Sequence, residues 1–179
     1  MKHSPLLLAF LFAVQQTHAA AGTQQPSCAP ACIELHDQYD APQRLAFPSS
    51  NVVVLTIADK KGSEQIDGWV TPIKARYGAR VELRGLADVG GVPGWLRGKV
   101  RKRFQESRPY PVMMDWFGTN CSSFAYQTGV ANLLVIGRDG TIHARFAGAA
   151  TPAALAQAGT VLDRILPPPP KSAPGALRP

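Results

Sequence analysis

The feature that most constrains the fold of this chain is the run "NVVVLTIA" at residues 51–58. Every residue after the asparagine is apolar or β-branched, and no polar alternation interrupts the run. Such a run is typical of a central strand that is buried on both faces. The sequence therefore predicts a sheet with further layers packed on both of its sides.

A loop and a helix are predicted directly after this strand. The tetrapeptide "DKKG" has turn chemistry, and Ser63 offers an N-cap for a helix that follows it. Glu64 and Asp67 suit the first turn, because carboxylates are favoured at a helix N-terminus. A helical stripe continues to Gly78, which is predicted to end the helix, and Pro72 lies inside it.

Alternating strand and helix patterns fill the rest of the chain. Residues 33–47 predict an early hairpin with Ile33, Leu35, Leu45 and Phe47 facing inward. Further strands are predicted in "RVELRGLADV" and "YPVMMDW", and "NLLVIGRDGTIHARFAG" predicts a hairpin with a tight turn. A last helix is predicted to start at Thr151, with Pro152 at its first position. The class is α/β, with a mixed central sheet, helices on both faces and an N-terminal β-hairpin.

The two ends of the chain differ in composition from the middle. Residues 1–21 have a basic start, an apolar run and three small residues, which is the layout of a secretory signal peptide. Residues 22–32 form a polar leader with a C-x3-C pair, residues 33–166 the domain, and residues 167–179 a proline-rich tail that is expected to be disordered. We expect a periplasmic or secreted protein without a transmembrane segment after signal cleavage, because the apolar run is too short to span a bilayer.

The formal net charge is +7, and basic residues concentrate in "RGKVRKRFQESR". Leu96, Val100 and Phe104 are predicted to anchor one side of this helix, which leaves Arg97, Arg101 and Arg108 facing outward. A solvated helix face is one interpretation, and a patch for an anionic envelope surface or an unknown acidic protein is the other. Nucleic acid is not expected as a partner of an exported protein.

The order of these elements resembles the redoxin or TlpA-like branch of the thioredoxin superfamily. The segments that carry the resemblance are "IELHDQYDAPQRLAF", "VVVLTIAD", "DGWVTPIKARYG" with Pro72, "YPVMMDWFG" and "YQTGVANLLVIGRDGTI". They cover most of the chain from residue 33 to residue 166. The resemblance implies a thioredoxin-like fold.

The resemblance also implies a reactive cysteine pair in the loop before the first helix, and that pair is absent here. Counting back from Pro72 by the family's spacing reaches Asp67 and Glu64, whereas counting forward from the strand reaches Lys61 and Glu64. The family's cis-proline position falls on Ala131 or Asn132, where a trans peptide bond is expected. Dithiol exchange needs a thiolate at the helix N-terminus, so this loop is predicted to lack that chemistry.

The chain has three cysteines, all outside that loop. Cys28 and Cys32 are predicted to form a structural disulfide, since exported thiols tend to oxidise. The alternatives are a redox-active pair, and a copper or zinc site of Cys28, Cys32 and His36. Cys121 is either a small buried residue or a thiol activated by a short helix, in which case it is a candidate catalytic residue.

These observations lead to one preferred function and two alternatives. We expect an exported thioredoxin-like protein without the usual dithiol site, with an accessory or binding role in the cell envelope and no cofactor. The first alternative is a thiol-disulfide oxidoreductase that uses Cys28 and Cys32 or Cys121. The second is a metal carrier, for copper above all, at Cys28, Cys32 and His36.

Overall fold

The structure is a computed structural model of the 179-residue chain, and it describes residues 27–108 and 110–167. It begins with an antiparallel hairpin of β1 (Cys32–His36) and β2 (Pro42–Ala46). Ile33 and Leu45 lie opposite each other in this hairpin and are both buried. The predicted N-terminal hairpin is therefore confirmed.

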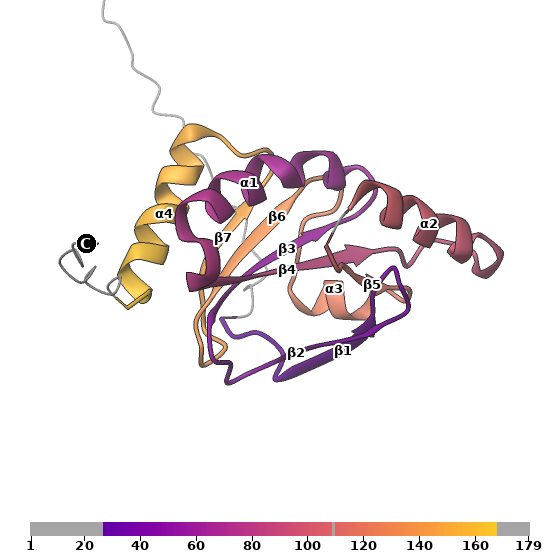
Figure 1. Ribbon diagram of the computed structural model, residues 1–179, viewed down its shortest axis with the longest axis horizontal. Helices are drawn as coiled ribbons and strands as arrows, with labels where there is room; N and C mark the ends of the chain where they lie inside the picture. The colour runs from indigo at the N-terminus through magenta and orange to yellow at the C-terminus, as the bar shows by residue number, and fades with distance from the viewer. Residues whose placement is uncertain (1–26, 109, 168–179) are drawn as a thin grey trace, which may run out of the picture.

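A five-stranded mixed sheet forms the centre of the molecule, with the strand order β5-β4-β3-β6-β7 (Figure 1). Strands β5, β4 and β3 are parallel, β6 runs antiparallel to β3, and β7 runs antiparallel to β6. The strands are β3 (Val52–Ala58), β4 (Val81–Asp88), β5 (Met113–Asp115), β6 (Asn132–Ile136) and β7 (Ile142–Ala147). The run that was predicted to be a central strand is β3, in the middle of the sheet.

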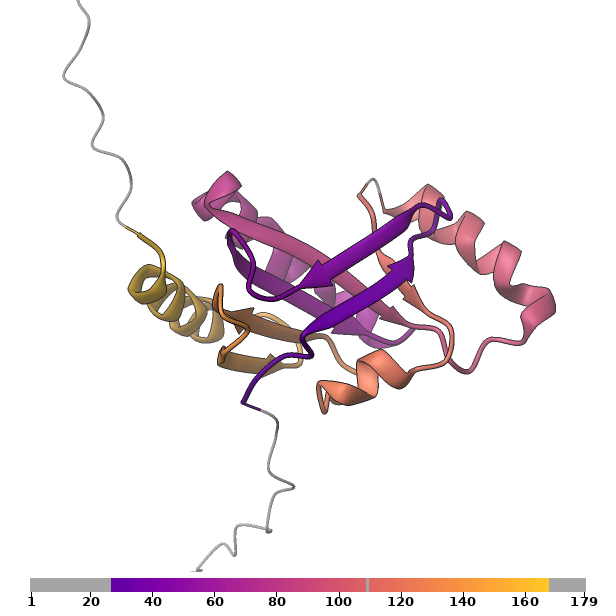
Figure 2. The ribbon, with the colours of Figure 1, turned by 90° about the horizontal axis from the view of Figure 1, so that it is seen from below.

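Helices cover both faces of the sheet, as predicted. Figures 1 and 2 show α1 and α4 together on one face, α3 and the hairpin on the other, and α2 beyond the β5 edge, at the end of the molecule opposite α4. The α-helices are α1 (Ile66–Tyr77), α2 (Arg97–Ser107), α3 (Thr119–Ser123) and α4 (Pro152–Ile165). Short 3-10 turns precede or follow them, namely η1 (Gly62–Gln65), η2 (Gly78–Arg80) and η3 (Gly94–Leu96).

The apolar side chains of β3 alternate between two cores. Val52 and Val54 pack with α1 and α4 on one face. Val53, Leu55 and Ile57 pack with the hairpin and α3 on the other. Each buried side chain of this size contributes roughly 1.5–3 kcal/mol relative to an exposed one, so β3 ties the two layers together.

Two of the three predicted helix boundaries agree with the structure. The Thr151 side chain accepts the N–H of Ala154 at 3.1 Å and caps α4, and Gly78 ends α1 at a φ of 53°. The Ser63 prediction is wrong, because Ser63 lies inside η1 and its Oγ donates to the Lys60 carbonyl at 2.8 Å. The extra 3-10 turn moves the start of α1 three residues beyond Ser63.

Several predictions concern segments that lie outside the described residues. The predicted signal peptide at residues 1–21, the first part of the leader and nearly all of the proline-rich tail are among them. Within residues 27–108 and 110–167, none of the helices has the length and apolar character needed to cross a membrane.

Candidate functional site at the start of helix α1

The carboxylate of Asp59 joins the loop after β3 to the loop before β6. It accepts the N–H of Gly62 at 2.8 Å and the N–H of Gly129 at 2.6 Å. Asp59 directly follows β3, as the first residue of the predicted turn "DKKG". The sequence predicted that turn, but not that its first residue would bind a second loop 70 positions further along the chain.

Gly62 lies directly against the backbone of Val130 and Ala131. A Cβ atom at Gly62 would stand 2.2 Å from the Val130 carbonyl oxygen and 2.9 Å from the Ala131 nitrogen. The Ala131 N–H also donates to Gln65 Oε1 at 3.1 Å. The loop that the resemblance links to the reactive pair therefore contacts the loop that it links to the cis-proline.

The second of these loops contains no cis peptide bond. In the described residues the cis bond is the one between Phe47 and Pro48, so the bonds on either side of Ala131 are trans, as predicted. The buried Asn132 side chain donates to the carbonyls of Val130 at 3.0 Å and Gln127 at 2.8 Å. An asparagine hydrogen-bond network thus supports the turn before β6.

The two alignments of the loop place the family's cysteine positions in different surroundings. Lys61 and Glu64 flank the segment that touches Val130 and Ala131, and both side chains are exposed. Asp67 lies in the first turn of α1, where its carboxylate forms an ion pair with Arg108. Neither alignment places a cysteine in this loop, and both pairs, Lys61 with Glu64 and Glu64 with Asp67, remain predictions.

Arg108 connects α2 to the start of α1. Its guanidinium binds Asp67 and also donates to the Ser63 carbonyl at 2.9 Å, and only 16% of its side chain is exposed. The fully buried Gln38 of the hairpin turn donates to the Tyr110 carbonyl at 2.8 Å and accepts the Val112 N–H at 2.8 Å. Arg108 is thus bound to the start of α1, and Tyr110 and Val112 are bound to the hairpin turn.

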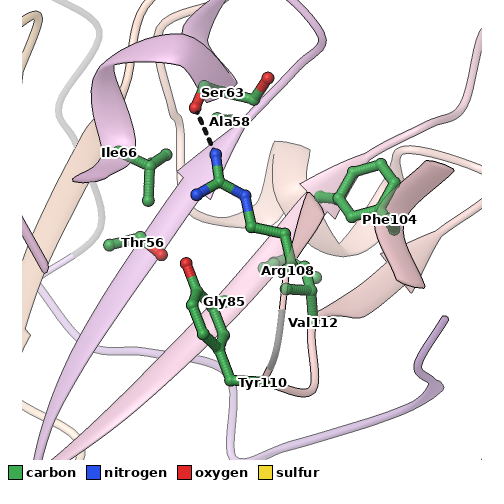
Figure 3. A pocket seen from close by; sticks show the side chains of 11 residues that line it. Thr56, Ala58, Ser63, Ile66, Gly85, Phe104, Arg108, Tyr110 and Val112 are labelled. Atoms are coloured by element: carbon green, nitrogen blue, oxygen red, sulfur yellow. Dashed lines mark hydrogen bonds between the residues drawn. The ribbon is translucent and has the colours of Figure 1, made fainter. Parts of the chain in front are cut away.

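A small pocket lies between α1, α2 and the ends of β3 and β4 (Figure 3). Figure 3 shows the Arg108 side chain reaching Ser63 and the Tyr110 hydroxyl pointing into the same space. That hydroxyl is buried and has no hydrogen-bond partner among the described residues. The cavity volume of about 30 Å³ suits a water molecule rather than an organic ligand.

The three outward-facing arginines predicted for the basic helix turn inward instead. Arg97 lies over the rings of Trp116 and Phe117, at 5.2 and 5.5 Å from their centres. Arg101 forms an ion pair with Asp40 at 2.7 Å, and Arg108 is the residue that binds Asp67. The prediction is wrong because aromatic and acidic partners from other elements line this side of α2.

Cys121 is fully buried in α3 and is not placed as a nucleophile. Burial and the nearby charges of Asp115 and Asp88 raise the pKa of the Cys121 thiol far above its usual range. The buried Asp115 carboxylate accepts the N–H groups of Gly118 at 3.1 Å and Cys121 at 2.8 Å. Of the two predicted roles for Cys121, the geometry favours the small buried residue.

Cys28 and Cys32 are both exposed, and each carries a free thiol in this structure. The backbone of Cys28 forms an isolated antiparallel β-bridge with Thr141, beyond the end of β6. This bridge lies at the opposite end of the sheet from η1. The Cys32 thiol donates to Glu34, which also binds Arg44. The predicted disulfide therefore remains a prediction.

The proposed metal ligands do not come together. Cys32 and His36 occupy the two ends of β1, about 13 Å apart along an extended strand. His36 is bound instead to Asp40 at 2.9 Å. No group of three histidine, cysteine or acidic side chains with metal-binding geometry occurs in the part of the chain that the structure describes.

The strand order, the helices on both faces and the two loops that meet at Gly62 define a thioredoxin-like fold. No protein family model matches the sequence, and no curated protein matches it. Solved structures do match. One is a protein from Chlorobium tepidum that is named as a candidate thiol:disulfide interchange protein DsbE. It has a TM-score of 0.61 and 16% identity over 79% of this chain and 97% of that chain.

Two further structures show the same fold. The exposed lipoprotein thioredoxin Etrx1 from Streptococcus pneumoniae has a TM-score of 0.59 and 15% identity over 74% of this chain and 99% of its own. StoA from Bacillus subtilis has a TM-score of 0.56 and 13% identity over 76% and 98%. The chain therefore has a thioredoxin-like fold, as the resemblance implied.

Proposed function

We propose that this chain is an exported thioredoxin-like protein that does not use the dithiol chemistry of its structural neighbours. Its role would be that of an accessory or binding protein in the cell envelope. The observation that carries the proposal is the contact of Gly62 with Val130 and Ala131, in a loop around Lys61 and Glu64 that contains no cysteine. Export is supported by the signal-peptide pattern of residues 1–21.

The chemistry of the loop supports a binding role. Disulfide exchange proceeds by attack of a thiolate, and neither an ammonium group nor a carboxylate can replace it. Lys61 and Glu64 are exposed on a loop that Asp59 and Gln65 hold in place through hydrogen bonds to Gly129 and Ala131. A pair of opposite charges on such a fixed loop is suited to recognising a polar partner.

The proposal is tested with the insulin reduction assay on the chain from residue 22. We expect no acceleration over dithiothreitol alone, and no peroxidase activity. The variant Lys61→Cys/Glu64→Cys is expected to form an intramolecular disulfide and to gain some activity, because it places thiols at the start of the helix. The matched variant Glu64→Cys/Asp67→Cys is expected to gain less, since Asp67 faces Arg108. Clear reductase activity of the natural sequence, lost in Cys28→Ser, would contradict the proposal.

A redox role for Cys28 and Cys32 is the second candidate function. It is favoured by their exposure and by Arg44, a cation that interacts with both Cys32 and Glu34. Thiol counting of the native protein with and without reductant separates this role from a structural bridge. A pair that reduces and reoxidises readily in a glutathione buffer supports the redox role, whereas a bridge that resists reduction supports a structural one.

A further inference from the structure

Two large aromatic side chains project from neighbouring loops at one end of the molecule. Trp95 is 82% exposed and Phe117 is 79% exposed. The loops after β4 and β5 meet closely, because a Cβ atom at Gly90 would stand 3.1 Å from the Phe117 carbonyl carbon and 3.0 Å from the Gly118 nitrogen. The segments that carry Trp95 and Phe117 therefore lie next to each other at this end of the molecule.

Two arginine side chains of α2 pack over aromatic rings beside this surface. Arg97, the first residue of α2, lies over both the Trp116 and the Phe117 rings, and Arg101 lies 5.7 Å from the centre of the Trp116 ring. Trp116 is half-buried beneath them. These contacts involve Arg97 and Arg101 on the inward side of α2. The charged residues on the outward side of the helix take no part in them.

The outward side of α2 is basic. Lys99, Lys102 and Arg103 are exposed, and Glu106 is the acidic residue of the helix. Trp95 precedes Lys99 by four positions and Lys102 by seven in the continuous run of η3 and α2, which is the spacing of one helix face. Figure 1 shows that α2 forms one end of the molecule, clear of the helices on α4's side.

We propose that Trp95, Lys99, Lys102 and Arg103, with Phe117 on the adjoining loop, form an aromatic–basic surface that docks on membranes rich in anionic phospholipid. Tryptophan favours the headgroup region of a bilayer, and lysine and arginine are attracted to anionic headgroups. Trp95 and Phe117 project into solvent. Projecting side chains can insert between lipid headgroups, which surround them more completely than a short bound peptide would. The proposal does not depend on the missing dithiol site.

Vesicle flotation tests the proposal with the chain from residue 22. Vesicles of phosphatidylcholine with phosphatidylglycerol are compared with vesicles of phosphatidylcholine alone, at low and at high salt. We expect binding to the anionic vesicles at low salt, weakened by salt because screening shortens the range of the attraction. The fluorescence of Trp95 is expected to shift to shorter wavelength on binding, and the Trp95→Phe variant assigns that shift.

Three variants separate the surface from a general charge effect. Lys99→Gln/Lys102→Gln/Arg103→Gln is expected to weaken the partition coefficient on the order of a hundredfold, from the contribution of each cation near a membrane. Trp95→Ala/Phe117→Ala is expected to weaken binding to neutral and anionic vesicles alike. The control Lys74→Gln/Arg138→Gln/Arg164→Gln removes the same charge from other exposed positions and is expected to bind almost as the natural sequence does.

Circular dichroism and melting temperature confirm that each variant is folded. Equal binding of the surface variants and the natural sequence would overturn the proposal. So would equal losses in the surface and control charge variants, or no binding to anionic vesicles at low salt. Capture of an acidic protein through Trp95 without vesicle binding would also overturn it.

Discussion

At the scale of single residues, the candidate site depends most on a position that carries no functional group. Gly62 is buried and touches the Val130 carbonyl, so the space that a side chain would need is already filled by backbone. Backbone atoms cannot move aside as the end of a flexible side chain can. The close approach of the two loops therefore requires glycine at this position.

Replacing Gly62 by alanine is expected to lower the free energy of unfolding by about 1–3 kcal/mol, the usual cost of overpacking. The clash at 2.2 Å should push the loop before β6 away and break the hydrogen bond from Ala131 to Gln65. Denaturant unfolding measures the first effect, and faster hydrogen exchange of the Ala131 amide measures the second.

Gly91→Ala is the matched control. A Cβ atom at Gly91 meets nothing within 4 Å, so the stability is expected to stay the same or rise slightly. Similar stability of both variants would show that the two loops are not in contact as described.

At the scale of elements, α2 differs most from what its sequence predicted. The apolar residues Val100 and Phe104 do pack against the sheet, in the cluster that contains Val112 and Met114. Arg97, Arg101 and Arg108 share that side of the helix, since their spacing keeps them on the same stripe. Long cationic side chains can lie on the buried side when their charged ends reach a partner.

The Arg108→Ala variant tests whether α2 holds the start of α1. It removes the donor to the Ser63 carbonyl and the ion pair with Asp67, and we expect a loss of about 1–2 kcal/mol in the free energy of unfolding. Hydrogen exchange at residues 62–67 should become faster, whereas the α4 amides should change little.

Arg103→Ala is the control from the exposed side of the same helix. Its stability is expected to change by less than about 0.5 kcal/mol, as is usual for a surface substitution. If the two arginine variants lose the same stability, the contacts of Arg108 do not hold the start of α1.

At the scale of the whole molecule, both faces of the sheet are covered, and the second core encloses Cys121. This residue packs with Ile57, Leu86, Met113 and Phe124 between the sheet and α3. The side chain titrates only when the whole protein unfolds, because it is fully buried. Its pKa therefore links global stability to pH.

The free energy of unfolding is expected to fall as the pH rises above about 9, the ordinary pKa of a cysteine thiol. The unfolded chain then loses the Cys121 proton while the folded chain keeps it, which costs about 1.4 kcal/mol per pH unit. Below that pH the thiol contributes no slope. Tyr126, whose pKa is raised by burial and by Asp88, adds a loss of the same sign at higher pH.

Comparison with Cys121→Ala isolates the thiol. Unfolding is measured in reductant at a series of alkaline pH values, and Cys28 and Cys32 are present in both proteins. The stability difference between the natural sequence and the variant should shrink as the pH rises. A difference that stays constant would mean that Cys121 ionises in the folded protein.

The central strand, the hairpins, the end of α1 and the start of α4 were determined by the sequence alone. Each rests on a local pattern: the apolar run of β3, the turn at Gly137–Gly140, the glycine at Gly78 and the pair Thr151 and Pro152. Local patterns suffice there because strand burial, turn geometry and helix capping depend on residues a few positions apart. The absence of a cysteine from the loop after β3 is equally a property of the sequence.

The tertiary structure alone decided how the candidate site is assembled. The bond from Gly129 to Asp59 joins residues 70 apart in the chain, and the bond from Arg108 to Ser63 joins residues 45 apart. No periodicity records such pairs, because they exist only after the sheet has brought its strand ends together. The same reason explains why Arg108 faces inward: its partners belong to another helix, and the sequence of α2 by itself contains no sign of them.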